Sequence, residues 1–131
     1  MGPSTDSAGI VFASAVPIFR IFDEAKAREF YLGFLGCTVD WEHRFHPGAP
    51  LYCQLSRGAL KLHLSEHHGD STPGSTVVVY MEGVEALQRE LIAKNYRNNR
   101  PGLQKQDWGL ECTVIDPFHS RIRFLEARGD A

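Results

Sequence analysis

The chain has few of the features that mark membrane, secreted or nucleic-acid-binding proteins. No apolar run approaches the roughly 18 residues that a membrane-spanning helix needs, and residues 1–7 lack both the basic and the apolar part of a secretory signal. The formal net charge is −2, and no basic stripe is present to neutralise phosphates. We therefore expect a cytoplasmic protein that binds neither a membrane nor nucleic acid.

Cysteine and catalytic motifs are also scarce. The three cysteines, Cys37, Cys53 and Cys112, are odd in number, lack C-x-x-C spacing and lie in or beside apolar runs. This pattern predicts buried thiols in a reducing compartment. No G-x-S-x-G elbow or comparable pattern places a nucleophile beside a base, so nucleophilic catalysis has little support.

The composition that is present fits one globular domain. The chain has 131 residues, of which 43% are hydrophobic and 23% are charged. Residues 1–9 are small and polar and residues 127–131 are polar and charged, so both ends are predicted to be tails around a single domain at 10–126.

Apolar periodicity divides the domain into two similar halves. In the first half it predicts a strand over residues 10–19, where Pro17 indicates an edge or a bulge, a helix from Asp23 to a glycine stop at Gly36, and strands at 37–45, 51–56 and 60–65. The helix rests on apolar positions at i, i+3, i+4 and i+7, which are Ala27, Phe30, Tyr31 and Phe34.

The second half begins the same order again. A strand is predicted at 75–81, a helix from Val84 to Asn95, a weakly marked strand within 96–107, and strands at 110–115 and 121–125 joined by a turn at Asp116-Pro117. The repeat of about 60 residues predicts an α+β fold of two βαβββ modules, about 10–66 and 75–126. Each module forms a curved mixed sheet with its helix on the outer face.

Strand alternation assigns side chains to two faces. On the strand at 60–65 the leucines face the helix, and Lys61, His63 and Ser65 face the other way. On the last strand Ile122 and Phe124 face the helix, and Arg121, Arg123 and Leu125 lie opposite. Two such modules side by side would enclose a cavity lined by polar groups.

Several short stretches follow one another in a specific order and spacing. They are Ser14-Ala15-Val16-Pro17, Glu29-Phe30-Tyr31 with Leu35-Gly36, Arg57-Gly58, residues 62–67, Pro73-Gly74-Ser75, Trp108-Gly109 and Asp116-Pro117. Together they resemble the glyoxalase/bleomycin-resistance, or vicinal oxygen chelate, superfamily from residue 13 to 126, and most of all its bleomycin-resistance proteins. The resemblance implies a homodimer in which the N-terminal strand crosses to the partner subunit.

Enzymes of that superfamily hold a divalent metal through His or Glu on four strands. Counting from the matched turns, these positions are Val16, His63, Thr76 and Arg123. Only His63 is a residue of the ligating type, because Val16 has no lone pair and the Arg123 guanidinium repels a dication, so we predict no metal, no cofactor and no catalytic residue. Two looser groups of possible metal ligands run from strands into loops, where side chains diverge. One contains His63, Glu66, His67, His68 and Asp70, and the other contains Glu42, His43 and His46.

The resemblance implies a ligand groove at the dimer interface. Trp41 and Trp108 match aromatic residues that line the groove and can stack on a flat heteroaromatic group such as a bithiazole, although Trp41 can also pack under a neighbouring strand. The other candidates for ligand binding are Asp40, Glu42 and Glu111, which attract positive charge, together with His63 and Arg123.

The predicted function is binding without chemistry: sequestration of a bleomycin-type glycopeptide, as in antibiotic resistance. Arg44, His46 and Arg123 near the groove work against a cationic ligand. Two alternatives therefore stay open. One is an enzyme, a lyase or dioxygenase, with a metal relocated around His63, and the other is a binder of an anionic metabolite through Arg123.

Overall fold

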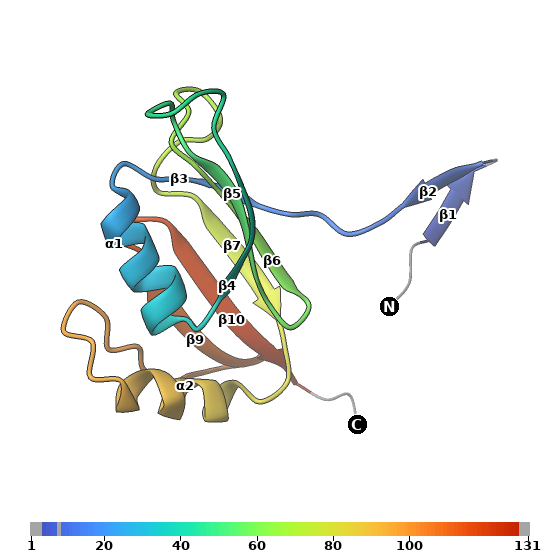
Figure 1. The fold of residues 1–131 in the computed structure, drawn as a ribbon. Coiled ribbons are helices and arrows are strands. Elements are labelled where there is room, and N and C mark those ends of the chain that lie inside the picture. The colour runs from blue at the N-terminus through green and yellow to red at the C-terminus, as the bar shows by residue number, and fades with distance from the viewer. Residues whose placement is uncertain (1–3, 8, 129–131) are drawn as a thin grey trace.

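The computed structural model describes residues 4–7 and 9–128, and consists of two four-stranded mixed sheets and a separate N-terminal hairpin (Figure 1). The hairpin joins β1 (Ser4–Ser7) and β2 (Ile10–Phe12). The first sheet, in the order β3-β6-β5-β4, contains β3 (Ile18–Arg20), β4 (Thr38–His43), β5 (Tyr52–Arg57) and β6 (Leu60–Ser65). The second, β7-β10-β9-β8, contains β7 (Thr76–Tyr80), β8 (Gln104–Gln106), β9 (Gly109–Ile115) and β10 (Arg121–Ala127). The predicted α+β fold of two βαβββ modules is confirmed.

The N-terminal segment differs from the prediction. The sequence predicts one strand over residues 10–19, but the structure divides it into β2 and β3. Pro17 lies at the break, because it has no N–H to donate to a ladder, while its carbonyl oxygen accepts a hydrogen bond from the His63 N–H at 2.9 Å. Ser4–Ser7, expected in a tail, forms β1, and residues 129–131 of the expected C-terminal tail lie outside the described residues.

The first helix begins where the sequence predicts. Asp23 caps α1 (Glu24–Arg28), because its carboxylate accepts a hydrogen bond from the Lys26 N–H. The helix continues as a π-helical segment, η1 (Glu29–Phe34), which buries Phe30, Tyr31 and Phe34, and Gly36 follows with a φ of +75°. The second helix, α2 (Val84–Ala93), is followed by Asn95 in the left-handed region, as predicted. No helix among the described residues is long and apolar enough to cross a membrane.

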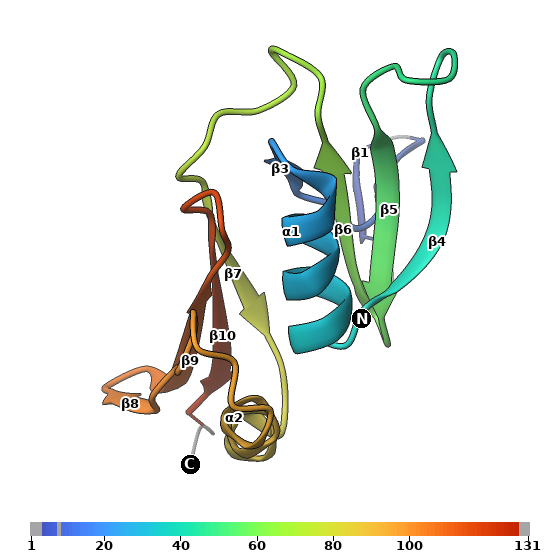
Figure 2. The ribbon, with the colours of Figure 1, turned by 60° about the vertical axis from the view of Figure 1, so that its left-hand side comes forward.

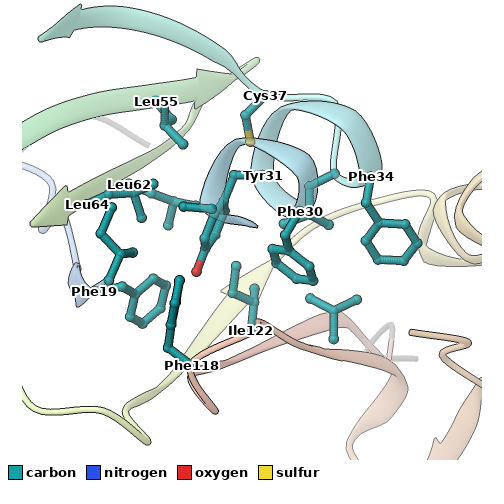
Figure 3. Close-up of a cluster of buried hydrophobic side chains, with 14 of the residues drawn as sticks. Phe19, Phe30, Tyr31, Phe34, Cys37, Leu55, Leu62, Leu64, Phe118 and Ile122 are labelled. Carbon is teal, nitrogen blue, oxygen red and sulfur yellow. The ribbon is translucent and has the colours of Figure 1, made fainter. Parts of the chain in front are cut away.

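The first helix lies between the two sheets (Figure 2). Leu55, Leu62 and Leu64 of the first sheet pack on one side of it, and Phe118 and Ile122 of the second module lie on the other (Figure 3). All of these side chains belong to one buried cluster, so the two modules share a core. The faces of the two sheets that point away from this helix therefore point away from each other (Figure 2).

A buried hydrogen bond joins the two modules inside this core. The Tyr31 hydroxyl donates to Asp116 Oδ2 at 2.7 Å, and Asp116 Oδ1 accepts from the N–H groups of Phe118 and Ser120. Burial raises the pKa of Asp116, and the hydrogen bond from Tyr31 opposes that rise. At the other end of the helix, Arg57 donates to the Leu35 carbonyl and pairs with Glu90 on α2.

Candidate ligand-binding site

The side chains that face away from α1 on the first sheet form what we call the first open face. Its members alternate with buried leucines and cysteines and are Asp40, Trp41, His43, Tyr52, Gln54, Ser56, Lys61 and His63. On β6 the alternation is as predicted, because Leu62 and Leu64 are buried while Lys61 is exposed and His63 is half-buried. Ser65, predicted on the same face as His63, is fully buried and donates to Asp70.

A β-bulge in β4 decides which side chains reach the first open face. The pairing passes from Val39 opposite Leu55 to Trp41 opposite Gln54, so Asp40 is the extra residue. The Asp40 carboxylate accepts from Gln54 Nε2 at 3.0 Å and Ser56 Oγ at 2.8 Å, which keeps it on this face beside Trp41. These two hydrogen bonds lower the pKa of Asp40.

The same bulge removes Glu42 from the predicted groove. Glu42 lies opposite Cys53, a residue buried against the helix, and its carboxylate pairs with Arg28 of α1. The sequence prediction grouped Glu42 with Asp40 and Trp41 for its negative charge, and strict alternation would put Asp40 and Glu42 on one face and Trp41 on the other. The extra residue shifts that alternation by one position.

Three rings form an aromatic wall on the first open face. The Trp41 and Tyr52 rings are nearly parallel, with centroids 5.9 Å apart and an interplanar angle of 11°. The His63 ring meets both edge-on, with its centroid 5.3 Å from Trp41 and 5.2 Å from Tyr52. Trp41 is 43% exposed, so it is not packed beneath a neighbouring strand, and part of the indole is available to a ligand.

A chain of hydrogen bonds holds these rings in place. The Tyr52 hydroxyl lies 2.7 Å from His63 Nδ1, and His63 Nε2 lies 3.0 Å from Gln54 Oε1. Because an amide oxygen only accepts, Nε2 carries the proton and Nδ1 accepts from the tyrosine. Burial lowers the pKa of His63, which favours this neutral form. Both ring nitrogens are thus engaged within the protein.

Aromatic residues that the sequence prediction missed extend the wall. His43 lies opposite Tyr52, and its ring meets Phe45 edge-on at 4.8 Å. The His67 ring lies 5.9 Å from Phe45 and 6.4 Å from Tyr52. The positions of Tyr52 and Gln54, two residues apart on a strand, carried a signal in the sequence, whereas Phe45 and His67 lie beyond strand ends, where alternation gives no guidance.

The second sheet presents a different set of side chains away from the helix, which we call the second open face. Its members are Thr76, Val78, Tyr80, Glu111, Thr113, Ile115, Arg121 and Arg123. Arg123 lies on the central strand β10 between Val78 and Thr113. Leu125, predicted on this face, pairs with Tyr80 and Glu111 but is only 5% exposed.

Trp108 and Glu111 are coupled at one end of the second open face. Trp108 Nε1 donates to Glu111 Oε2 at 3.1 Å, and Gln106 Nε2 donates to Oε1 at 3.3 Å, so the buried carboxylate is satisfied within its own sheet. Glu111 and Arg123 lie on the same face, but a pair between them is not among the salt bridges of residues 9–128. Trp108 is 57% exposed.

The predicted site residues thus fall into two groups that one chain does not bring together. Asp40, Trp41 and His63 lie on the first open face, and Trp108, Glu111 and Arg123 belong to the second sheet. Two clefts in the chain, of about 900 and 720 Å³, are lined by other residues.

The four positions that match metal ligands of the related enzymes carry Val16, His63, Thr76 and Arg123, and both His63 nitrogens are engaged. In the looser group, Glu66 accepts from the Leu51 N–H and Asp70 from Ser65, which turns them to separate partners. Over the described part of the chain, no three His, Cys, Asp or Glu residues gather closely enough to hold a metal. This donor set does not fit the metal site of the superfamily enzymes.

Solved structures share this fold. A bleomycin-binding protein from bleomycin-producing Streptomyces verticillus, complexed with copper(II)-bleomycin, matches with a TM-score of 0.69 and 21% identity over 91% of this chain and 99% of its own. An antibiotic binding protein from Streptomyces sp. CB03234 matches with a TM-score of 0.70 and 19% identity over 93% of this chain and all of its own. No curated protein matches the sequence.

The family comparison covers almost the whole chain. The family model described as glyoxalase superfamily protein matches residues 3–130, which include both modules and the loop between them. The sequence resemblance, the two βαβββ modules and this match agree. The chain belongs to the glyoxalase superfamily.

Proposed function

We propose that this protein binds a small molecule through a flat aromatic group and sequesters it without chemical conversion. The observation that carries the proposal is the aromatic wall of Trp41, Tyr52 and His63, which is partly exposed and fixed by a hydrogen-bond chain from Asp40 to Tyr52. A fixed wall loses little side-chain entropy when a flat ligand stacks on it. Each aromatic contact contributes about 0.5–1.5 kcal/mol beyond area burial.

The chemistry of the described residues favours binding over catalysis. The ring nitrogens of His63 are held by neighbours, which leaves no lone pair poised toward a substrate. Burial raises the pKa of each thiol, Cys37, Cys53 and Cys112, to about 11, so these cysteines are protonated at neutral pH. A buried neutral thiol is a poor nucleophile.

The complete groove is proposed to form between two copies of the chain. Because the open faces of one chain point apart (Figure 2), a second copy is needed to set Arg123 and Trp108 opposite the aromatic wall. The hairpin extends away from the body (Figure 1), and Ile10, Val11 and Phe12 are between 49% and 61% exposed. These apolar side chains suit an arm that exchanges with the partner subunit.

The first ligand to test is a bleomycin-type glycopeptide, because the structural neighbours include bleomycin-binding proteins. Metal-free bleomycin and its copper complex are titrated while tryptophan fluorescence is recorded. The proposal predicts quenching at about one ligand per subunit (Kd in the micromolar range or below). No quenching at tens of micromolar would reject this ligand.

The two-copy groove is tested by light scattering during gel filtration. The full chain is expected to elute as a dimer, and a variant that lacks residues 1–12 as a weaker dimer with reduced ligand affinity. A monomeric full chain that still binds one ligand would contradict the proposal that the groove needs a second copy.

A further inference from the structure

The carboxylates of the two open faces are already committed to the protein. Asp40 accepts from Gln54 and Ser56, and Glu111 accepts from Trp108 and Gln106. Glu42, the third acidic candidate, is on the opposite side of its sheet and pairs with Arg28. Asp40 and Glu111 keep their negative charge, but each of their oxygens already accepts one hydrogen bond from a neighbouring side chain, which fixes the carboxylates toward the protein.

The cations of these faces are in the opposite situation. Arg121 and Arg123 lie two residues apart on β10, and their strand neighbours on this face are Thr76, Val78, Thr113 and Ile115, which carry no charge. Within residues 9–128 neither guanidinium takes part in a salt bridge. Lys61 adds a further exposed cation to the first open face.

The position of Arg123 is unusual for an arginine without a carboxylate. It lies on a central strand and is half-buried, so its stem crosses the middle of the second open face rather than its rim. Val78 at 40% exposure lies directly beside it, and its diagonal neighbours on β9 are Ile115, at 42% exposure, and Glu111, whose carboxylate accepts from Trp108 and Gln106. A half-buried guanidinium binds an oxyanion more strongly than one in open water, and it can do so with two parallel hydrogen bonds.

We propose that the ligand of this protein is a planar aromatic carboxylate, whose ring stacks on the aromatic wall of one copy while its carboxylate is bound by Arg123 of the other. This inference rests on the proposed function and names the class of its ligand. It departs from the cationic glycopeptide, because the charged groups of these faces that form no salt bridge or hydrogen bond with a carboxylate among residues 9–128 are cationic, namely the guanidinium groups of Arg121 and Arg123 and the ammonium group of Lys61.

The test uses three naphthalenes of one shape and different charge: 2-naphthoate, 2-naphthamide and 2-naphthylmethylammonium. Isothermal titration calorimetry measures each with the full-length protein, with Arg123→Ala and Arg123→Lys, and with Arg89→Ala as the control. Arg89 is an exposed residue of α2 outside both open faces, so its removal changes the net charge equally. Gel filtration with light scattering follows the oligomeric state of each variant.

We expect 2-naphthoate to bind about tenfold more tightly than 2-naphthamide, and the ammonium compound to bind least. Arg123→Ala should abolish the preference for the carboxylate, Arg123→Lys should retain part of it, and Arg89→Ala should keep it whole. The preference should also shrink as salt is raised.

Four results would overturn the inference. Equal binding of all three compounds would reject the carboxylate but leave the aromatic groove standing. Tightest binding of the ammonium compound would restore a cationic ligand. No binding of any compound, with Trp41→Ala indistinguishable from the unmodified protein, would remove the proposed function together with the inference. If Arg123→Ala weakens the dimer and leaves the preference intact, Arg123 serves the subunit contact instead.

Discussion

The two sheets have the same strand order but present different chemistry on their open faces. The first face is built from aromatic rings joined by hydrogen bonds, and each polar atom of His63 has a partner on a neighbouring strand. The second face sets its arginines opposite uncharged side chains, and among the described residues its side-chain hydrogen bonds lie at the Trp108 end. The βαβββ module thus carries a rigid aromatic wall in the first half of the chain and an arginine-bearing face in the second half. Repetition of the backbone therefore does not imply repetition of function.

The largest expected effect comes from removing the buried hydrogen bond between Tyr31 and Asp116, which we call the joint because it connects the two modules. Asp116→Ala removes the acceptor for Tyr31 and for the N–H groups of Phe118 and Ser120, all inside the core. We expect the free energy of unfolding to fall by about 3–5 kcal/mol, because three buried donors lose their partner. Urea unfolding followed by circular dichroism measures it.

Tyr31→Phe is the matched control for this change. It removes a single donor and keeps the ring in the core, so the cost should be about 1–2 kcal/mol. Two separate transitions in Asp116→Ala would show that the sheets unfold independently once the joint is lost, whereas an unchanged midpoint would contradict the role of the joint.

The second prediction concerns the support of Trp108 on the second face. Gly109 has a φ of +156°, and a Cβ there would overlap the backbone carbonyl oxygen of Glu126. Gly109→Ala should cost about 2–3 kcal/mol and shift the fluorescence maximum of Trp108. Gly74→Ala is the control, because Gly74 also has a positive φ but has open space around it, so it should cost about 1 kcal/mol.

The third prediction compares the two tryptophans directly. Trp41→Ala should lower the affinity for an aromatic ligand about tenfold, since it removes the stacked ring of the wall. Trp108→Ala should lower it only about threefold, because Trp108 stands at the end of its face. Titration calorimetry measures both, and a larger loss for Trp108 would reverse the assigned roles of the two faces. Trp41→Tyr, which keeps a flat ring, should recover most of the lost affinity.

The smallest expected effect is a pH dependence of stability that arises from His63 on the first open face. Burial lowers the pKa of His63 below its ordinary value of 6.5. The unfolded chain therefore takes up a proton more readily, so the contribution of His63 to stability is complete above pH 6.5 and is lost as pH falls toward the lowered value. NMR titration of the His63 ring should give a pKa below that of free histidine, and His63→Asn should flatten the dependence of Tm between pH 7.5 and 5.

Local patterns in the sequence predicted most of the fold. Apolar spacing identified both helices and their ends at Gly36 and Asn95, since these signals depend only on neighbours in the chain. Alternation on β6 and β10 assigned Leu62, His63 and Arg123 to the correct faces. The break in the first strand was missed, because β3 pairs with β6, and residues 10–19 do not encode that long-range contact. The hairpin strand β1 was missed, because residues 4–7 are small and polar and lack the apolar alternation that marks a strand.

The site was less predictable than the fold. Glu42 was misplaced because a bulge depends on how β5 pairs with β4, which the β4 sequence alone does not reveal. Trp41 and Trp108 were expected in one groove at a dimer interface, and this stays a prediction, because alternation tells which face of its own sheet a side chain takes and not which faces of two chains meet. The contribution of Tyr52 and His67 to the wall required three-dimensional contacts between β5 and the loop after β6.

Asp40 is the one extra residue of β4, and its presence in the strand matters as much as its charge. If β4 paired with β5 without the bulge, Asp40 and Glu42 would both turn outward and the indole of Trp41 would be pressed against the helix. Loss of the bulge would exchange the indole on the open face for the carboxylate of Glu42, beside the Asp40 that is already there. The same residues of β4, paired without the bulge, would therefore make this face acidic along β4 with every residue of β5 and β6 unchanged.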